Sequence, residues 1–405
     1  MDYVSVSKIY YKYPDSYESE YKNRFTSPFT KHISLIIQQF GHKNAYPIFY
    51  CYTEEIANLQ DKIMTDFFSL YKLIDEIPGA GITQFLYTRL VEEIKSSNDI
   101  EGVHSTRKEI RAALNSNEKK RLSGIVNKYE KIINDEEIPL KTCQDIRNLF
   151  NDFLADEIKM DDPENLPDGV LFRKNSVDII SETQKILHRG VFPEAKIIQT
   201  MDSALSILND DAIPIFIRIA IFHYLFGYIH PFYDGNGRMS RFITSYLLSK
   251  QLHPTIGLQV SILIKKNRKK YYDLFQEADS ELNRGDLTPF IIGTLQFIHA
   301  AISYTKDVLQ KKWKQYLSYS NCLDLLEIDD HTTYKIYDVL LQAAVFSYGG
   351  ATIDEIAYTI KKTKSTVYSR LKTIPPDRYM ILKRTRPYHY RLNLKFLDKK
   401  SKNIL

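Results

Sequence analysis

Apolar residues recur at helical spacing through most of the chain. Residues 53–77 (TEEIANLQDKIMTDFFSLYKLIDEI) and residues 82–100 (ITQFLYTRLVEEIKSSNDI) each place an apolar stripe along one face, which is typical of amphipathic helices. The sequence PGAG at 78–81 separates them, and Gly102 is of a residue type that ends helices. Two or three further helices are expected over 105–160, so the pattern predicts an all-α body.

Two segments depart from this pattern. In residues 163–195, proline and glycine bracket short β-branched runs, which predicts a small extended hairpin over 177–187. Residues 213–229 (IPIFIRIAIFHYLFGYI) are apolar on nearly every side. This stretch is seventeen residues long and carries Arg218 and His223, so it is predicted to be a helix buried in the core and not a membrane span.

The end of the chain follows a different plan. Residues 306–326 form a long polar pattern that predicts a connecting helix. Beyond it, three short helical segments precede RYMILKRTRPYHYRLNL (378–394), which alternates like two strands around Arg386 and Pro387. Three helices and a two-stranded wing are typical of a winged helix-turn-helix. The predicted parts are an N-terminal helical extension (1–81), a central domain (82–305), a helical linker (306–330) and the winged helix (331–405).

Charge is distributed unevenly along the 405 residues. The formal net charge is only +5, yet residues 360–405 contain fourteen lysines and arginines against two acids, which leaves the rest of the chain with an excess of acids. A basic module on a mildly acidic body makes nucleic acid one candidate partner, and a solvated basic tail is the alternative. The hydrophobic share of 43% is that of an ordinary globular protein with a substantial core.

The cysteines and the start of the chain bear on location. Cys51, Cys143 and Cys322 are odd in number, far apart and without metal-ligand spacing, so neither a disulfide framework nor a zinc site is supported. The first residues show no basic segment followed by an apolar run, which is the pattern of a secretory signal. We therefore expect a cytoplasmic protein with no membrane partner.

Residues 230–241 (HPFYDGNGRMSR) concentrate chemistry-bearing side chains. A residue before proline is pushed out of the right-handed helical region, so the preceding helix is predicted to end and His230 to project from a loop. The glycines of 234–237 permit a tight turn, and the next helix is expected from Arg238 to Leu248. A helix start after glycines offers free backbone N–H groups and the positive end of a dipole, which favour a phosphate.

The side chains of this segment are suited to a polyphosphate and a metal ion. Arg238 and Arg241 are three residues apart, so they share one face of the first helical turn and can reach the same anion. Asp234 can supply the oxygen ligand that Mg²⁺ prefers, and His230 is suited to accept the proton of an attacking hydroxyl. The alternative is a histidine that caps a core helix before a surface turn.

This segment resembles the motif of Fic-domain proteins, H-P-F-x-[D/E]-G-N-G-R-x-x-R, and the resemblance covers roughly residues 82–303. Nine positions match: His230, Pro231, Phe232, Asp234, Gly235, Asn236, Gly237, Arg238 and Arg241. The resemblance implies the helical Fic fold and transfer of AMP from ATP to a tyrosine, threonine or serine hydroxyl of a target protein. It implies that His230 is the base, that Asp234 holds Mg²⁺, that Gly235, Asn236 and Gly237 form the anion hole, and that Arg238 and Arg241 bind the outer phosphates.

An upstream segment resembles the inhibitory signature of the same family, [S/T]-x-x-x-E-[G/N]. Here it reads Ser97-Asn98-Asp99-Ile100-Glu101-Gly102, which implies an inhibitory helix N-terminal to the catalytic motif, with Glu101 paired to Arg241. A carboxylate in that place would occupy donors meant for the γ-phosphate of ATP. Two alternatives are an ordinary helix-end glutamate and a glutamate that orients a water to remove AMP again.

Two further parts of the site follow from the resemblance. The hairpin takes the place of the family's flap, which lines up the target as an added strand; its candidate residues are Val177, Asp178, Ile179, Ile180 and Leu187, and a purely structural hairpin is the alternative. Residues 265–275 resemble the segment beside adenine, so Tyr271 or Tyr272 is a candidate to stack on the base, although adjacent helical tyrosines more often contribute one to the core. Asp279 stands where the family often has asparagine, which leaves adenine selectivity open.

The C-terminal module keeps a second class of function open. Residues near the start of its expected recognition helix are of types that reach phosphates and base edges: Lys362, Lys364, Ser365, Thr366, Tyr368 and Arg370. Such modules also dock proteins or form homodimers. The competing hypothesis is therefore a DNA-binding, antitoxin-like regulator whose Fic core only senses nucleotide. Intact His230 and Asp234 favour the enzyme, since a sensor needs no base.

Overall fold

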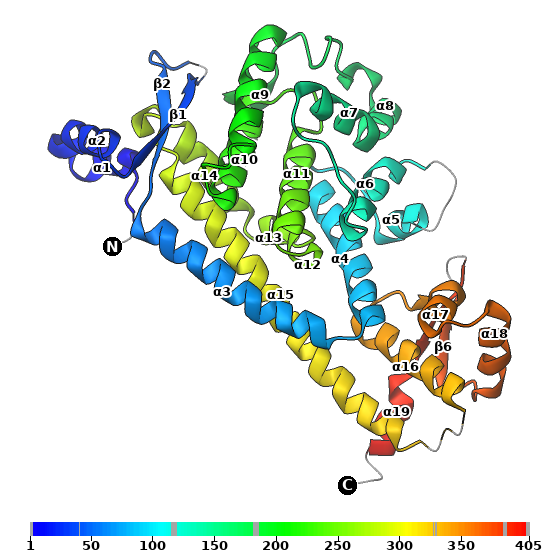
Figure 1. Cartoon of the computed structure of the whole chain (residues 1–405). Coiled ribbons are helices and arrows are strands. Elements are labelled where there is room, and N and C mark those ends of the chain that lie inside the picture. Colours follow the sequence, from blue (N-terminus) through cyan, green and yellow to red (C-terminus); the bar gives the residue numbers. More distant parts are fainter. Residues whose placement is uncertain are drawn as a thin grey trace. The chain divides into compact units, whose positions relative to one another are not determined.

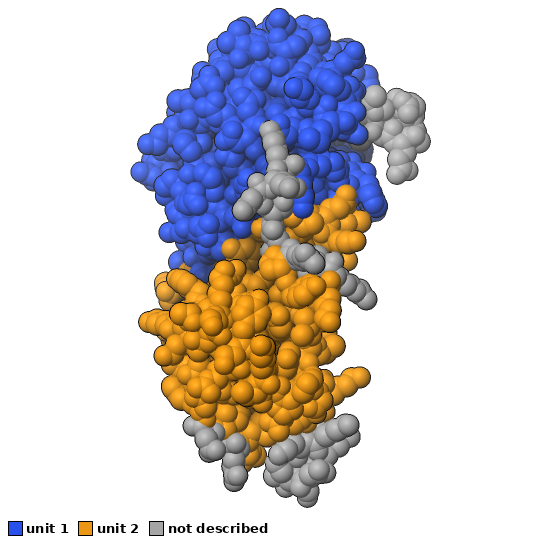
Figure 2. Space-filling model, turned by 90° about the vertical axis from the view of Figure 1, so that its right-hand side faces the viewer, with its two compact units in different colours: residues 1–66, 93–105, 120–302 blue, residues 67–92, 106–119, 303–405 orange. Residues whose placement is uncertain are grey.

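The computed structural model describes residues 3–39, 41–114, 120–180, 186–326, 328, 330–383 and 387–401. Over these ranges the chain is mostly helical with three small antiparallel sheets, which confirms the all-α prediction (Figure 1). It divides into two compact units (Figure 2). The first, here called the large unit, comprises residues 1–66, 93–105 and 120–302; the second, the small unit, comprises residues 67–92, 106–119 and 303–405.

The N-terminal part of the large unit contains a hairpin as well as helices. Its elements are α1 (Val6–Lys12), a 3-10 turn (Pro14–Ser16), α2 (Tyr17–Phe25), β1 (Thr30–Ile37) and β2 (Tyr46–Cys51). The two strands pair antiparallel with a register shift between His32 and Ile36, and Phe49 of β2 bridges to Asp286. The sequence predicts only helices here. Burial alternates along residues 32–37, but the apolar Ile36 occupies an exposed position, which hides this alternation in the sequence.

Helices from α3 onward form the body around the site. They are α3 (Glu54–Glu76), α4 (Gly79–Ile100), α5 (Arg107–Leu114), α6 (Ser123–Ile133), α7 (Cys143–Phe153), α8 (Ala155–Asp161), α9 (Glu194–Leu208), α10 (Ile215–Ile229), α11 (Asn236–Gln251), α12 (Pro254–Gly257), α13 (Val260–Lys266), α14 (Arg268–Asp279) and α15 (Thr288–Asp324). Twelve of the fifteen residues of α10 are buried, so its uniform apolarity marks a core helix. Among the described residues, no helix combines the length and apolarity needed to cross a bilayer.

Two helices run through boundaries expected from the sequence. The predicted break between the first two long helices is present, but it lies at Ile77 and Pro78, because residues 79–81 already form the start of α4. Gly102 beyond α4 has a φ of +74°. The boundary at 81/82, however, lies within α4, and that at 305/306 lies within α15. No proline or glycine interrupts α15 after Gly293, so the predicted linker helix is the second half of one 37-residue helix.

The end of the small unit contains more strands than the sequence indicates. Its elements are α16 (His331–Phe346), β5 (Ala351–Thr352), α17 (Ile353–Ile360), α18 (Lys364–Thr373), β6 (Tyr379–Leu382), β7 (His389–Leu392) and α19 (Leu394–Ser401). The two expected strands, β6 and β7, are present, although Arg386 between them lies outside the described residues. β5 adds a third strand in the order β5-β7-β6, and at two residues it is too short to leave a periodic signal.

Candidate active site

The backbone at the end of α10 presents His230. The N–H of His230 donates to the carbonyl of Phe226 at 3.0 Å, and the residue then turns into the left-handed region, with φ 50° and ψ 60°. Pro231 excludes the right-handed helical conformation, as predicted. A residue with a β-carbon pays about 1 kcal/mol or more in this region and stays there only when its surroundings fix it.

The turn after His230 is closed by the side chain of Asn236. Its Oδ1 accepts from the N–H of Phe232 at 2.9 Å and its Nδ2 donates to the carbonyl of Phe232 at 2.7 Å. Phe232 is fully buried and stacks on Phe150 of α7 with ring centroids 4.0 Å apart. Gly235 has a φ of +83°, and a β-carbon there would collide with Leu154. These contacts start α11 at Asn236, two residues earlier than the sequence predicts.

Arg238 lies in a buried chain of charges. It is 2% exposed and donates to Glu157 of α8 and, through Nη2, to Asp234 Oδ2 at 3.2 Å. Glu157 also accepts from Arg121 at 3.1 Å. The Asp234 side chain is 44% exposed, so its carboxylate is the accessible oxygen donor of the turn. Mg²⁺ in proteins is commonly held by one or two carboxylates together with phosphate oxygens, and Asp234 fits that requirement.

Arg241 joins the end of α4 to the start of α11. It is 1% exposed, donates through Nε to Ser97 Oγ at 3.1 Å and through Nη2 to the carbonyl of Ser97 at 3.0 Å, and forms an ion pair through Nη1 with Glu101 Oε1 at 2.7 Å. The Glu101 carboxylate also lies against Gly237, where a β-carbon would collide with it. The predicted pairing of Glu101 with Arg241 is therefore present in the structure, and the carboxylate lies in the first turn of α11.

The charges of this pair stabilise each other. Burial alone would raise the pKa of Glu101, but the charge and hydrogen bond of Arg241 outweigh it and lower that pKa below its ordinary value. Burial would likewise lower the pKa of Arg241, and Glu101 raises it. The first turn of α11 thus holds an ionised carboxylate against a guanidinium, as expected of a place that favours anions.

Burial governs the ionisation of His230. It lowers the pKa of the imidazole to about 3, and the positive charge of Arg173 acts in the same direction. A contact to the carbonyl of Gly227 and the charge of Glu101 act the other way, but less strongly. The imidazole is therefore neutral at physiological pH and able to accept a proton.

The predicted hairpin is present as β3 (Asp178–Ile180) and β4 (Ile186–Arg189), which pair antiparallel. Arg189 and Asp178 form a cross-strand ion pair at 2.5 Å. Val177 accepts from Gly190 through its carbonyl at the base of the hairpin. Residues 181–185 lie outside the described residues, as do the side chains of Ile180 and Leu187. Ile179 is 37% exposed, and its docking role stays a prediction.

One strand of this hairpin faces a polar cluster. His188 of β4 contacts Gln39 Oε1 through Nδ1 and the carbonyl of Tyr228 through Nε2, both at 2.8 Å. Gln39 and Tyr224 donate to Asp279 at 2.6 and 2.9 Å, and burial raises the pKa of that aspartic acid to about 7. Asp279 therefore links α14 to α10 and to the N-terminal hairpin, which is a role that its position in the sequence does not reveal.

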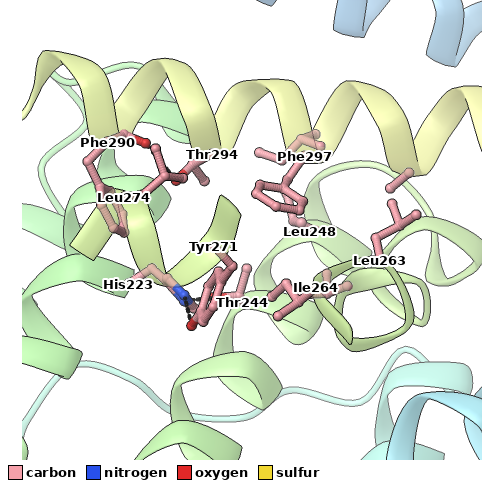
Figure 3. Close-up of a pocket in the computed structure, with 13 residues that line it drawn as sticks. His223, Thr244, Leu248, Leu263, Ile264, Tyr271, Leu274, Phe290, Thr294 and Phe297 are labelled. Carbon is pink, nitrogen blue, oxygen red and sulfur yellow. Dashed lines mark hydrogen bonds between the residues drawn. The ribbon is translucent and has the colours of Figure 1, made fainter. Parts of the chain in front are cut away.

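The two candidate adenine-side tyrosines have different environments. Tyr271 is 8% exposed, and its hydroxyl contacts Nε2 of His223 at 2.9 Å (Figure 3). It lines an apolar cavity of about 40 Å³ together with Thr244 and Phe297, so it is a core residue. Tyr272 is 37% exposed and has the Arg268 guanidinium over its ring. Stacking on a base stays a prediction, and Tyr272 has the surface position for it.

Three buried charged residues support the site without any sequence signal. Arg173 donates to the backbone carbonyl of His230, and Glu157 pairs with Arg238. Glu93 of α4 accepts from the N–H of Ser261 at 2.8 Å. None of them belongs to a recognisable spacing, since their partners are distant in the chain. Only the fold brings these residues together.

Comparisons with known proteins identify the type of domain that contains the site. Residues 143–248, which include the whole of the 230–241 segment, match the sequence model of the Fic/DOC family. The chain therefore contains a Fic domain. A segment of 72 residues is 43% identical to "Protein adenylyltransferase Fic" of Aedes aegypti and 40% identical to that of Drosophila melanogaster. This segment is 18% of the chain and spans only 13% of each of these relatives.

A solved structure extends the likeness beyond the matched segment. A Fic family protein from Desulfovibrio desulfuricans G20 superposes with a TM-score of 0.52 at 19% identity. The superposition covers 85% of this chain and 97% of the other. At that identity the comparison shows a shared fold.

The low pKa of His230 predicts that its ring does not take up a proton near neutral pH. An ordinary imidazole protonates near pH 6.5, whereas His230 should remain neutral from about pH 8 down to about pH 5. The unfolded chain does take up that proton, so this histidine should lower the free energy of unfolding as the pH falls below about 6.5. We expect the His230 ring signals in ¹H–¹⁵N NMR, assigned by comparison with His230→Gln, to be constant over that range. A midpoint near pH 6.5 would contradict the assignment.

Proposed function

We propose that this protein transfers AMP from ATP to a tyrosine, threonine or serine hydroxyl of a target protein and releases diphosphate. The observation that carries the proposal is the anion site at the start of α11, where Arg241 and Gly237 hold a carboxylate that the chain itself supplies, Glu101. The names of the relatives in mosquito and fly support the same activity. The target and its modified residue follow from neither.

The reaction needs a base and a place for the leaving diphosphate. The target hydroxyl oxygen attacks the α-phosphorus of ATP, the neutral imidazole of His230 accepts the hydroxyl proton, and the bond to the bridging oxygen breaks, leaving its electron pair on diphosphate. Arg241 and the first N–H groups of α11 would stabilise the phosphate charge. Asp234 would hold Mg²⁺, which when bound neutralises charge on the phosphates.

The two arginines of the motif would have separate tasks. Arg241 belongs to α11, and its Nη1 is now paired with Glu101. This donor would bind the phosphates directly. Arg238 is held between Glu157 and Asp234, so it would orient the metal-binding carboxylate and approach the phosphates from that side. A buried ion pair of this kind costs desolvation energy and requires good geometry in return.

Glu101 would restrain the enzyme. Its carboxylate occupies a donor of Arg241 and places negative charge where the γ-phosphate would lie, in a partly buried site where charges interact more strongly than in water. ATP could then bind only with its phosphates out of line, which slows transfer because reaction rates depend steeply on alignment. Removal of AMP with a water oriented by Glu101 is the second role open to this residue.

The part of ATP that becomes attached to protein distinguishes AMP transfer from phosphate transfer. Incubation with Mg²⁺ and ATP labelled at the α-phosphate should label protein, and ATP labelled at the γ-phosphate should not. His230→Ala should reduce the labelling by at least about 100-fold, because general-base catalysis contributes that much or more. Label from the γ-phosphate would indicate a kinase, and no protein label in either case would favour a nucleotide-sensing regulator.

The restraint can be tested with two acidic residues at the end of α4 and directly after it. Glu101→Gly should raise the rate of AMP transfer at least tenfold, since about 1.4 kcal/mol of recovered phosphate alignment gives that factor. Asp99→Gly is the matched control: it weakens the same helical turn but removes a carboxylate that pairs with Lys95 and Lys265, not with Arg241. Equal rates for the two variants would remove the inhibitory role from Glu101.

A second function is favoured by the end of the small unit. We propose that α16, α17, α18 and the sheet β5-β7-β6 form a winged helix that contacts duplex DNA. The exposed residues at and around α18 are mainly basic or hydroxyl-bearing: Lys361, Lys362, Thr363, Lys364, Ser365, Tyr368, Ser369, Lys372 and Thr373. Lys364 forms an ion pair with Asp354, and Arg370 forms one with Asp330 at 3.4 Å. These acids offset their charges, so Lys362 and Lys372 are the better candidates for phosphate contacts.

The salt dependence of DNA binding tests this second function. Binding of the full chain to a fluorescent duplex of about 20 base pairs should weaken with salt, and replacing Lys362 and Lys372 with alanine should reduce the log–log slope by about 1.8, because each lost phosphate contact contributes about 0.9. Alanine at Lys31 and Lys62, exposed lysines of the large unit, is the control and should leave the slope unchanged. A slope near zero for the unaltered chain would exclude phosphate contacts.

A further inference from the structure

Arg173 is buried and, among the described residues, its guanidinium forms no ion pair, although the charge of nearby Asp178 offsets part of the cost of its burial. Its relative exposure is 0%, and none of the acidic side chains in the described ranges forms an ion pair with it. Burial lowers the pKa of its guanidinium to about 10, which leaves it charged at physiological pH. A buried charge of this kind is costly unless its hydrogen bonds are satisfied, and a neutral side chain would fill the space at lower cost. The guanidinium therefore needs a reason beyond packing.

One side of Arg173 contacts the backbone around His230. Its Nε donates to the carbonyl of His230 at 2.9 Å, its Nη2 to that of Ile229 at 3.4 Å, and its own backbone N–H to that of Pro231 at 3.2 Å. The carbonyls of three consecutive residues are thus oriented by one arginine. They flank the residue that the chain holds in the left-handed region, which a histidine adopts only when its neighbours impose it.

The other side of Arg173 contacts both stems of the hairpin. Nη1 donates to the carbonyl of Asn175 at 2.5 Å and Nη2 to that of Val191 at 2.8 Å. Val191 in turn donates its N–H to the carbonyl of Ile229 at 3.1 Å. The same guanidinium therefore ties the segment before β3 and the segment after β4 to the end of α10.

Gly190 leaves the room that this arrangement requires. A β-carbon at Gly190 would collide with Nη2 of Arg173 and lie 2.9 Å from the β-carbon of His230. Gly190 of the hairpin stem, the Arg173 guanidinium and His230 are therefore closely packed, and Gly190 has no space for a β-carbon. Such close packing transmits a displacement of one part to the others.

We propose that Arg173 is a positioning residue that holds the His230 backbone and the base of the β3–β4 hairpin in one arrangement, so that the imidazole and the hydroxyl of a docked target meet in line with the nucleotide. The catalytic part of this proposal rests on the proposed AMP transfer. The planar fork of arginine can bridge several carbonyls in fixed directions, which the single ammonium of lysine cannot do. The hydrogen bonds of the Arg173 guanidinium go to backbone carbonyls, so we assign it a role through His230 and not on the nucleotide.

The test compares folded variants in the active Glu101→Gly background. Arg173→Met and Arg173→Lys should lower kcat for AMP transfer by about 100-fold, because a displacement of about 1 Å costs a factor of that size. The KM for ATP should be unchanged, since the anion site at Arg241 is separate. Arg147→Met is the matched control: Arg147 donates to the carbonyl of Leu171 at 3.0 Å, near the same hairpin stem, but to none of the three carbonyls around His230.

Hydrogen exchange provides a readout that does not depend on activity. In Arg173→Met the amides of Val191 and His230 should exchange faster, whereas in Arg147→Met they should exchange as in the parent. If Arg173→Met does not fold, as judged by its thermal unfolding, Arg173→Lys and Gly190→Ala make the same comparison. Should Glu101→Gly itself transfer no AMP, the proposed function fails and exchange alone decides the role of Arg173. Unchanged kcat and unchanged exchange in a folded Arg173 variant would overturn the proposal.

Discussion

The ion pair between Arg241 and Glu101 is the contact on which the arrangement of the site depends. Arg241 is almost completely buried, so it requires a partner, and Glu101 and Ser97 together satisfy its fork. Because the partners come from α4 and α11, the end of one helix is held against the start of the other. The same contact places a carboxylate where helix N-terminal amides favour an anion. Under the proposed function, one interaction would therefore both hold the two helices together and restrain the chemistry.

A second buried glutamate also connects α4 to α11. Eight residues before Glu101, Glu93 is fully buried and accepts from the N–H groups of Ser261 and Ile262 and from the hydroxyl of Ser245. Burial raises the pKa of Glu93, and these hydrogen bonds offset part of that cost. Glu93 lies within α4, whereas Glu101 follows its last residue, Ile100. Both carboxylates contact α11, Glu93 through Ser245 and Glu101 through Arg241.

Buried polar side chains recur around the site because the turn after His230 has an irregular backbone. Irregular segments leave carbonyl and N–H groups without helical partners, and such groups cannot be buried unpaired. Asn236 satisfies Phe232, and Arg173 satisfies the carbonyls around His230. The positive charge that Arg173 brings also helps to hold the nearby imidazole neutral. Support of the backbone and tuning of the histidine thus come from one side chain.

The pairing of Glu101 with Arg241 was implied by a family resemblance, whereas local pattern alone determined the helical character of the chain, a break near Pro78, the core helix before His230 and the glycine turn. These features depend on residues within one or two helical turns, whose effects on the backbone are short-ranged. The β1–β2 hairpin, the roles of Arg173, Glu157 and Asp279, and the burial of Tyr271 beside an exposed Tyr272 were decided by the tertiary structure. Each depends on partners tens of residues away, and nothing in the spacing of a side chain states which distant carbonyl or carboxylate the fold will bring to it.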